Sequence, residues 1–265
     1  MKKILELLFK LLLFLIFIFC FIKLLGWRSD NQKTKEVLND IEQNVSVNEE
    51  EDNSESIKEQ DETTISESDP YWEFVNKPFL KVNFSKLSLE NEDIFGWIEV
   101  PNTNINYPVT KTTNNEYYLT HDLYKRANGG GWVFLDYRNQ INFSNKNSII
   151  YAHGRENKTM FGTLRNILNK EWYENKENYI IRTNTKDNAQ IWQVFSVYKI
   201  LNTNDYIKTN FQSEEEYQSF LNFIKNRSIY DFQTGVSKDN KILTLSTCYD
   251  DYSKVVLHAK LIKSN

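Results

Sequence analysis

The stretch KILTLSTCYDDYSKVVLHAKLI, residues 241–262, contains two runs typical of β-strands with a turn between them. Residues 241–247 and 254–262 are rich in β-branched and other apolar side chains, which favour strands. The Asp and Ser residues of the intervening segment YDDYS are typical of a turn. The first run ends immediately before Cys248, so the sequence places a thiol where a strand gives way to a loop.

Six further segments carry the same β-rich signature and are separated by turn residues. They are residues 95–100, 105–109, 131–136, 148–153, 178–183 and 190–200. Eight short strands in one domain indicate a mainly β protein, built either as a closed barrel or as a sandwich.

Two segments within this β-rich region predict helices, namely residues 159–168 and residues 213–226. The second opens with Ser213 and Glu216 at the N-cap and N3 positions of a capping box. Its apolar residues then recur at i, i+3, i+4 and i+7, which indicates one buried face: Tyr217, Phe220, Leu221 and Ile224. Short helices are also predicted upstream of the first strand, within residues 71–90.

The N-terminus is a different kind of sequence. Residues 4–25 are apolar except for three charged side chains, at Glu6, Lys10 and Lys23. About 20 apolar residues cross a bilayer, and lysines near the ends of a span can reach the interfaces. A cleaved signal peptide is the alternative, but no A-x-A site follows the apolar run. We expect residues 1–28 to be a transmembrane anchor, with lysines before the span favouring a cytoplasmic N-terminus and the rest of the chain outside the cell.

The segment after this anchor is strongly acidic. Residues 30–69 hold fourteen acidic residues and three lysines, and residues 29–69 lack aromatics. Such a composition buries too little apolar surface to offset the entropy of ordering. We therefore expect residues 29–69 to be a disordered spacer, with an acidic binding tail as the alternative, and residues 70–265 to be the folded extracellular domain.

Cys248 is the candidate nucleophile of this domain. Of the two cysteines, Cys20 lies within the apolar span, so Cys248 has no disulfide partner in the exported part. A thiol becomes reactive when a neighbour stabilises the thiolate or removes its proton, and His is the usual partner. His153, at the end of a strand, is the favoured partner, with His121 and His258 as alternatives. A buried cysteine that merely packs is the competing interpretation.

Three segments together resemble the sortases, specifically class B: TLSTC ending at Cys248, YAHGRENKTMF around His153, and FGWIEVPNTNINYPV with the block that follows it. The resemblance covers about residues 72–263. It implies a closed eight-stranded β-barrel with N-terminal helices and a long helix before the cysteine strand. Sortases cleave a C-terminal sorting motif of secreted proteins after a Thr and join that Thr to an amine of the cell-wall peptide. Class B motifs are Asn-Pro-X-Thr-like and related Pro-X-Thr sequences, and nothing in this sequence selects among them.

The resemblance also implies roles for individual residues. Cys248 attacks the Thr carbonyl to form a thioacyl-enzyme, and His153 protonates the leaving amine and later accepts a proton from the incoming one. Ser246 lines the substrate groove and Thr247 lies beside the nucleophile. The implied partners are secreted proteins with a sorting motif, a peptidoglycan cross-bridge amine and the membrane. We expect no metal, no cofactor and no nucleic-acid partner.

The sequence departs from the family at the residue that stabilises the oxyanion. Sortases use an Arg on the strand after the nucleophile, and Lys254 stands at the matching position here. Arg offers a fixed fork of donors, whereas Lys is a mobile point charge. Lys254 itself, or Arg155 or Arg227 from elsewhere in the chain, is expected to fill this role. A weakened or inactive enzyme, or a different turn length that shifts the match, is the remaining interpretation.

Two functions of other classes compete with a membrane-anchored cysteine transpeptidase. One is a hydrolytic, papain-like cysteine peptidase, although that class carries its Cys at the start of a helix. The other is a non-catalytic surface protein on a sortase-like barrel, which the Lys at position 254 motivates.

Overall fold

The computed structural model describes residues 2–50, 57–58 and 71–265. Its α-helices are α1 (Lys2–Asn44), α2 (Tyr71–Phe74), α3 (Leu87–Glu90), α4 (Lys170–Glu174) and α5 (Glu214–Lys225). Its 3₁₀ helices are η2 (Tyr117–Leu119), η3 (Leu164–Leu168) and η4 (Lys176–Tyr179). Its strands are β1 (Val47–Glu50), β2 (Ile57–Lys58), β3 (Phe79–Val82), β4 (Ile94–Glu99), β5 (Asn106–Thr110), β6 (Phe134–Leu135), β7 (Asn147–Tyr151), β8 (Ile180–Thr185), β9 (Ala189–Leu201), β10 (Ile242–Cys248) and β11 (Ser253–Ser264).

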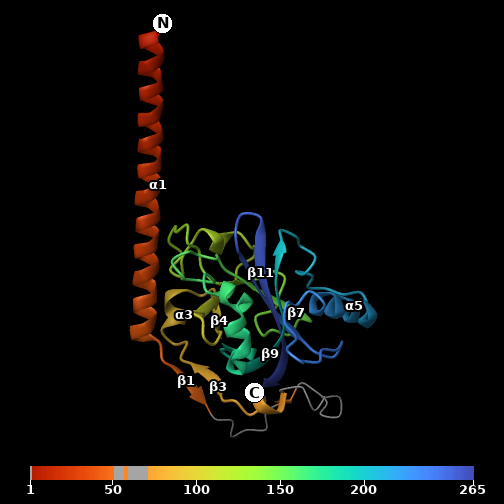
Figure 1. Ribbon diagram of the computed structural model, residues 1–265. Coiled ribbons are helices and arrows are strands. Elements are labelled where there is room, and N and C mark those ends of the chain that lie inside the picture. The colour runs from red at the N-terminus through yellow and green to blue at the C-terminus, as the bar shows by residue number, and fades with distance from the viewer. Residues whose placement is uncertain (1, 51–56, 59–70) are drawn as a thin grey trace.

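Strands β4 to β11 form a closed barrel (Figure 1). Their spatial order is β10-β7-β6-β5-β4-β8-β9-β11, and β11 pairs back with β10 to close the ring. The β10–β7 and β5–β6 pairs are parallel and the other pairs of the ring are antiparallel. The short strand β2 extends the sheet at β11, and β1 pairs with β3 outside the ring. This confirms the closed eight-stranded barrel and excludes a sandwich of two sheets.

Each of the eight strands predicted for the domain is present, and the boundaries shift by a few residues. The largest difference is in residues 131–136, of which only Phe134–Leu135 pair as β6. The reason lies at the start of the segment, where Gly131 has a φ of +59° and the backbone N–H of Trp132 donates to the carbonyl of Tyr118 at 2.8 Å. The backbone N–H of Trp132 is therefore bonded to η2 rather than to a strand.

Helix α5 is confirmed as the sequence predicts it. The backbone N–H of Glu216 donates to the Ser213 hydroxyl at 3.2 Å, and the Glu216 carboxylate accepts from the backbone N–H of Gln212 at 2.5 Å. The four predicted apolar residues are all buried. They join a second hydrophobic cluster that includes side chains of β9, β10 and β11.

The helix predicted for residues 159–168 is wrong in its first half. That half forms turns, and only η3 is helical. Met160 has a φ of +54°, which no α-helix contains, and the backbone N–H of Phe161 donates to the carbonyl of His153 at 3.0 Å. Bonding to the residue before Gly154 thus overrides local helix propensity.

The two short helices α2 and α3 agree with the prediction for residues 71–90. Between them the structure adds strand β3, which the sequence interpretation did not include. Its partner is β1, from the acidic segment, in an antiparallel register that pairs Val47 with Val82.

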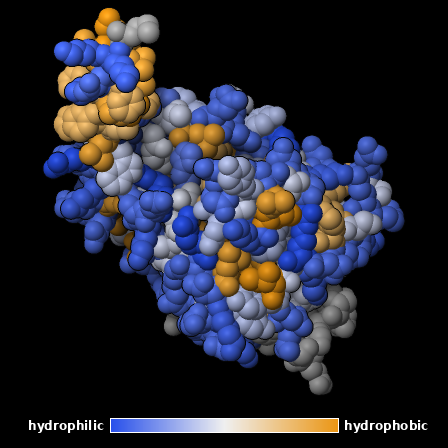
Figure 2. Space-filling view, turned by 45° about the horizontal axis from the view of Figure 1, so that its top comes forward, coloured by the Kyte–Doolittle hydropathy of each residue, from blue (hydrophilic) through white to orange (hydrophobic). Residues whose placement is uncertain are grey.

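Helix α1 is one continuous element whose two halves have different surroundings. Its N-terminal half carries exposed apolar side chains along its whole length and extends beyond the domain (Figures 1 and 2). By length and composition this helix can cross a membrane. Figure 2 shows the domain surface as mostly hydrophilic by comparison. The C-terminal half lies beside the domain and buries Thr34, Val37 and Ile41 against it.

The acidic segment therefore differs from the expected spacer in the part that the structure describes. Residues 29–44 continue α1, and Val47–Glu50 pair as β1. Because Thr34, Val37 and Ile41 recur at helical spacing on one face, the scattered aliphatics of this segment are sufficient to dock a helix. The expectation of disorder for residues 51–56 and 59–69 lies outside the described residues.

Candidate active site

The parallel pair β10–β7 brings Cys248 and His153 to the same end of the barrel. The last paired residues are Ser246 on β10 and Tyr151 on β7. Cys248 and His153 each follow two positions later, at the ends of neighbouring strands that run in the same direction. Because the carboxyl ends of adjacent parallel strands share one edge, the two side chains belong to one site.

The backbones beside these two residues are in direct contact. A Cβ on Gly154 would lie 2.1 Å from the carbonyl oxygen of Cys248, so only glycine fits there. The hydroxyl of Thr247 donates to the carbonyl of Ala152 at 2.8 Å, which continues the link between the strands beyond their last ladder pair. The relative position of the Cys and His segments is thus fixed by close packing.

The site is open to solvent. Cys248 is exposed and His153 is partly exposed. The Nε2 atom of His153 lies 2.8 Å from the carbonyl oxygen of Leu119. Because a carbonyl only accepts, Nε2 carries the hydrogen in this contact. The Nδ1 atom is therefore the nitrogen at which the neutral ring can take up a proton.

The other two histidines lie elsewhere. His121 stacks on the ring of Tyr117, with centroids 4.1 Å apart, and hydrogen-bonds locally. His258 is fully buried between the hydroxyls of Thr244 and Tyr198, and burial lowers its pKa to about 3. Neither lies beside Cys248 at the end of β10, so His153 is the histidine that the structure brings to the thiol.

Lys254 stands directly opposite Cys248. The two are Cα partners in the antiparallel β10–β11 ladder, and side chains of such partners lie on the same face with Cβ atoms about 4.5–5.5 Å apart. The Lys254 ammonium lies 6.0 Å from the centroid of the Tyr206 ring. The lysine that the sequence matched to the oxyanion position thus shares a face with the thiol.

The two arginines considered as substitutes have other partners. Arg155 donates to Thr34 and Asn31 of α1. Arg227 forms a bidentate pair with Asp205, with both N···O distances at 2.7 Å. Both guanidinium groups are therefore bound to these partners, and Cys248 is not among them.

Arg165 is a neighbour of the site that the sequence interpretation missed. Its Nη2 atom donates to the carbonyl of Tyr249 at 3.2 Å and is 3.4 Å from the carbonyl of Gly154. It therefore bridges the residue after the nucleophile and the residue after the histidine. The segment was interpreted as a regular helix, so no sequence signal placed this side chain at the site.

Ser246 lies just behind the nucleophile rather than at the surface. It is 3% exposed, and its hydroxyl is 2.8 Å from that of Tyr206. Burial raises the pKa of Tyr206 to about 12, so its hydroxyl keeps its proton at neutral pH. Ser246 and Cys248 are two positions apart on one strand and face the same side, with Tyr206 next to both of them.

Within the described part of the chain, no group of three or more His, Cys, Asp or Glu side chains is arranged to hold a metal ion.

Comparison with known proteins agrees with this geometry. A family model described as Sortase domain matches residues 98–262. Sortase B of Staphylococcus aureus is 36% identical over 188 residues, covering 69% of this chain and 76% of that protein. Sortase B of Listeria monocytogenes is 33% identical over 176 residues, covering 65% of this chain and 71% of that protein.

Solved structures show the same likeness. A Staphylococcus aureus sortase B–substrate complex superposes with a TM-score of 0.63 at 36% identity, covering 68% of this chain and 84% of that one. Sortase B from Bacillus anthracis in complex with AAEK1 has a TM-score of 0.68 at 29% identity, covering 89% of this chain and 99% of that one. The structural match thus extends upstream of the barrel.

Proposed function

The chain belongs to the sortase family, class B, and on that premise we propose how this cysteine transpeptidase works: Cys248 is the nucleophile, and His153 is the general acid and base. One observation carries the proposal. The two residues lie at the ends of adjacent parallel strands that are locked together, with Gly154 against the Cys248 carbonyl. A thiol and an imidazole at the same edge of the sheet support nucleophilic thiol catalysis, in which a base activates the nucleophile.

The first step makes a thioester. The sulfur of Cys248 attacks the carbonyl carbon of the Thr in the sorting motif, and the resulting tetrahedral species collapses with cleavage of the C–N bond. His153, as imidazolium, donates a proton to the departing amine. The Thr acyl group remains on sulfur, and the C-terminal part of the client protein leaves.

The second step transfers the acyl group to a new amine. The amine of a peptidoglycan cross-bridge attacks the thioester carbonyl and loses a proton to His153, and the C–S bond breaks. The product is an amide between Thr and the cell-wall peptide, and Cys248 is released as the thiolate. Since the thioester retains the reactivity of the acyl group, the exchange needs no nucleotide.

We assign stabilisation of the oxyanion in both steps to Lys254. Its pairing opposite Cys248 supports this role. A cation or N–H donor aimed at the developing oxyanion typically contributes 10²–10³-fold in rate, by order of magnitude. Thr247, which holds the two strand ends together, and Ser246, whose hydroxyl is hydrogen-bonded to that of Tyr206, are both buried and support the substrate groove from beneath.

We further assign the apolar half of α1 to the membrane. Its length and hydropathy support a span, and the lysines before it favour a cytoplasmic N-terminus. The barrel would then face clients and cell wall on the outer side, and residues 70–265 would form the catalytic domain with the docked part of α1 beside it.

A product assay tests the function. The full chain in mild detergent is incubated with a panel of Asn-Pro-X-Thr-like peptides, with and without an amine such as triglycine. Mass spectrometry is expected to show cleavage after Thr and an amine-linked product that Cys248→Ala abolishes. Cleavage whose products ignore the added amine would instead indicate a hydrolytic peptidase. An absence of turnover with every peptide would indicate a non-catalytic protein.

A further inference from the structure

The C-terminal half of α1 contacts two separate loops of the domain. We call residues 30–40 the docked half of α1. One loop comprises residues 117–131, and the other comprises residues 153–162 and begins with the catalytic histidine. The two loops are distant in sequence from α1, yet a single helix holds both.

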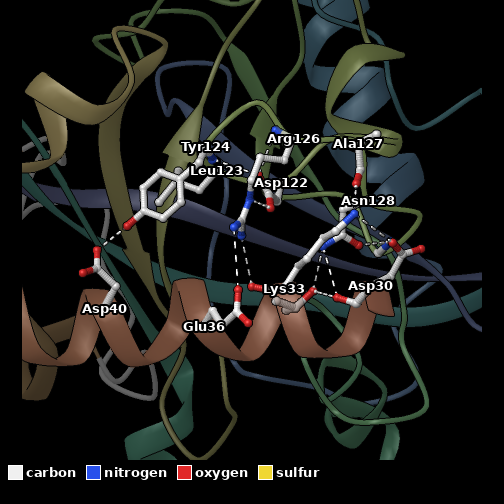
Figure 3. A network of polar contacts seen from close by, with 12 residues as sticks. Asp30, Lys33, Glu36, Asp40, Asp122, Leu123, Tyr124, Arg126, Ala127 and Asn128 are labelled. Atoms are coloured by element: carbon white, nitrogen blue, oxygen red, sulfur yellow. Dashed lines mark hydrogen bonds and ion pairs between the residues drawn. The ribbon is translucent and has the colours of Figure 1, made fainter. Parts of the chain in front are cut away.

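The polar face of the helix holds residues 124–129 of the first loop (Figure 3). The ammonium of Lys33 donates to the carbonyl of Ala127 at 2.9 Å, and the backbone N–H of Gly129 donates to the carboxylate of Asp30 at 3.0 Å. Further along the helix the acidic side chains pair with this loop as well: Glu36 with Arg126, and Asp40 with the Tyr124 hydroxyl.

The second loop is held through Arg155. Its guanidinium donates to the hydroxyl of Thr34 at 3.0 Å and to the side-chain oxygen of Asn31 at 2.5 Å. The side-chain amide of Asn157 donates to the same Asn31 oxygen at 2.8 Å. The hydrogen bonds from this loop to α1 are therefore all accepted by two residues, Asn31 and Thr34.

Arg155 also packs on the first loop. A Cβ on Gly130 would lie 2.0 Å from the Nη1 atom of Arg155, so the guanidinium packs directly against that glycine. Burial lowers the pKa of Arg155, and the nearby Asp30 carboxylate opposes that effect. A partly buried cation of this kind depends on its hydrogen-bond partners. Arg155 is thus the point at which helix, first loop and second loop meet.

His153 is the first residue of the second loop, and its ring contacts the first loop. Its Nε2 atom contacts the carbonyl of Leu119 in the first loop, at 2.8 Å. On the same side, a Cβ on Gly131 would lie 3.0 Å from the Cδ2 atom of His153. The ring is therefore bounded on one edge by the first loop while its backbone belongs to the second. The backbone of His153 is fixed against the Cys248 segment, so the contact with the Leu119 carbonyl sets the orientation of the ring about its side-chain bonds.

We propose that the docked half of α1 positions His153 by holding these two loops together, with Arg155 as the positioning residue. The inference rests on the proposed role of His153 as the acid and base of the transfer. Because the same helix continues into the proposed membrane anchor, full activity requires that the anchor helix be seated on the domain.

The test removes the side chains of α1 that accept hydrogen bonds from Arg155 and changes no residue of the barrel. The variant Asn31→Ala/Thr34→Val lacks the partners of Arg155, and Gln32→Ala is the matched control, because Gln32 is exposed on the same turn and bonds only to Glu36 of its own helix. With the full chain in nanodiscs, we expect kcat of the double variant to fall by about 10- to 100-fold with KM unchanged within about twofold, since displacing a catalytic group by about 1 Å has effects of this size. The control is expected to retain the original kcat.

A second readout reports on the ring itself. The chain has three histidines, so ¹⁵N-histidine NMR can follow the Nε2–H signal of His153, assigned by its loss in His153→Ala. We expect this signal to shift in Asn31→Ala/Thr34→Val and not in Gln32→Ala. An unchanged signal in the double variant would overturn the inference, whether or not kcat falls. If the original chain shows no transpeptidation while the signal shifts as expected, the proposed function fails and the positioning role stands.

Discussion

Cys248 and Lys254 are directly paired residues of one β-hairpin. The turn between the two strands is closed by the backbone N–H of Tyr249, which donates to the carbonyl of Ser253 at 2.8 Å. The Asp250 carboxylate braces the turn by accepting from the Ser253 hydroxyl at 2.7 Å. The backbone positions of the two residues are therefore fixed relative to each other by a hydrogen-bonded ladder and turn.

Replacement of this lysine tests its role at the oxyanion. We expect Lys254→Ala to lower the single-turnover acylation rate by about 10²–10³-fold, because the developing negative charge loses the cation paired opposite Cys248. Lys254→Arg is expected to keep or raise the rate, since the fork of donors suits an oxyanion. Quenched-flow measurement of thioester formation gives both rates. An alanine variant as fast as the original chain would assign the oxyanion to another group, with Arg165 the first to examine.

Gly154 tests the contact between the two strand ends. A Cβ at this position would lie 2.1 Å from the Cys248 carbonyl, so Gly154→Ala must push the His and Cys segments apart. We expect at least about a 10²-fold fall in acylation, the effect of a displacement near 1 Å. Gly26→Ala is the control, because an added Cβ there meets nothing within 4 Å. Equal rates for the two variants would show that the close contact is dispensable.

Thr247 tests the stability of the same junction. Thr247→Val leaves the buried carbonyl of Ala152 without its donor, which typically costs about 1–3 kcal/mol. Thr112→Val is matched to it, since the Thr112 hydroxyl donates to the Asn114 carbonyl at 2.8 Å on an exposed turn. Urea unfolding of the full chain is expected to show the larger loss for Thr247→Val. If both variants lose the same free energy of unfolding, the Thr247 hydrogen bond does not stabilise the junction of the two strands.

The buried His258 predicts a pH dependence of stability. Its pKa falls from 6.5 to about 3 in the folded chain, mainly through burial. Between these values the unfolded state binds more protons, so the free energy of unfolding decreases as the pH is lowered below 6.5. The decrease approaches about 1.4 kcal/mol per pH unit. Urea unfolding at pH 7, 6 and 5 measures the free energy of unfolding at each pH. His258→Gln is expected to reduce its dependence on pH. His121→Gln, at a partly exposed site, is expected to retain it.

The barrel is predictable from sequence because its signals are local. Each strand carries its own β-branched run, and α5 carries both its cap and its apolar face within fourteen residues, 213–226. Residues 159–168 were misjudged for the opposite reason. Their conformation depends on the bond from Phe161 to His153 and on the positive φ of Met160, which are consequences of tertiary structure.

The site likewise has a part that the sequence predicts and a part that depends on tertiary contacts. The register that places Cys248 beside His153 and opposite Lys254 emerges from strand pairing, and the family resemblance pointed to all three residues. Arg165 and the docking of α1 were not predictable, because they rest on polar contacts between segments far apart in the chain. Asn31 and Arg155, for example, are separated by 124 positions and have no periodic or compositional signal that joins them.

Intact-mass spectrometry of the acyl-enzyme tests the central claim most directly. The full chain is mixed with a sorting-motif peptide that it cleaves, first without and then with triglycine. We predict an adduct equal to the N-terminal product minus water, located on Cys248, that accumulates without the amine and is discharged to an amide when triglycine is added. His153→Ala is expected to slow both phases. Cleavage that proceeds with no adduct on Cys248, or with the adduct on another residue, would contradict the account.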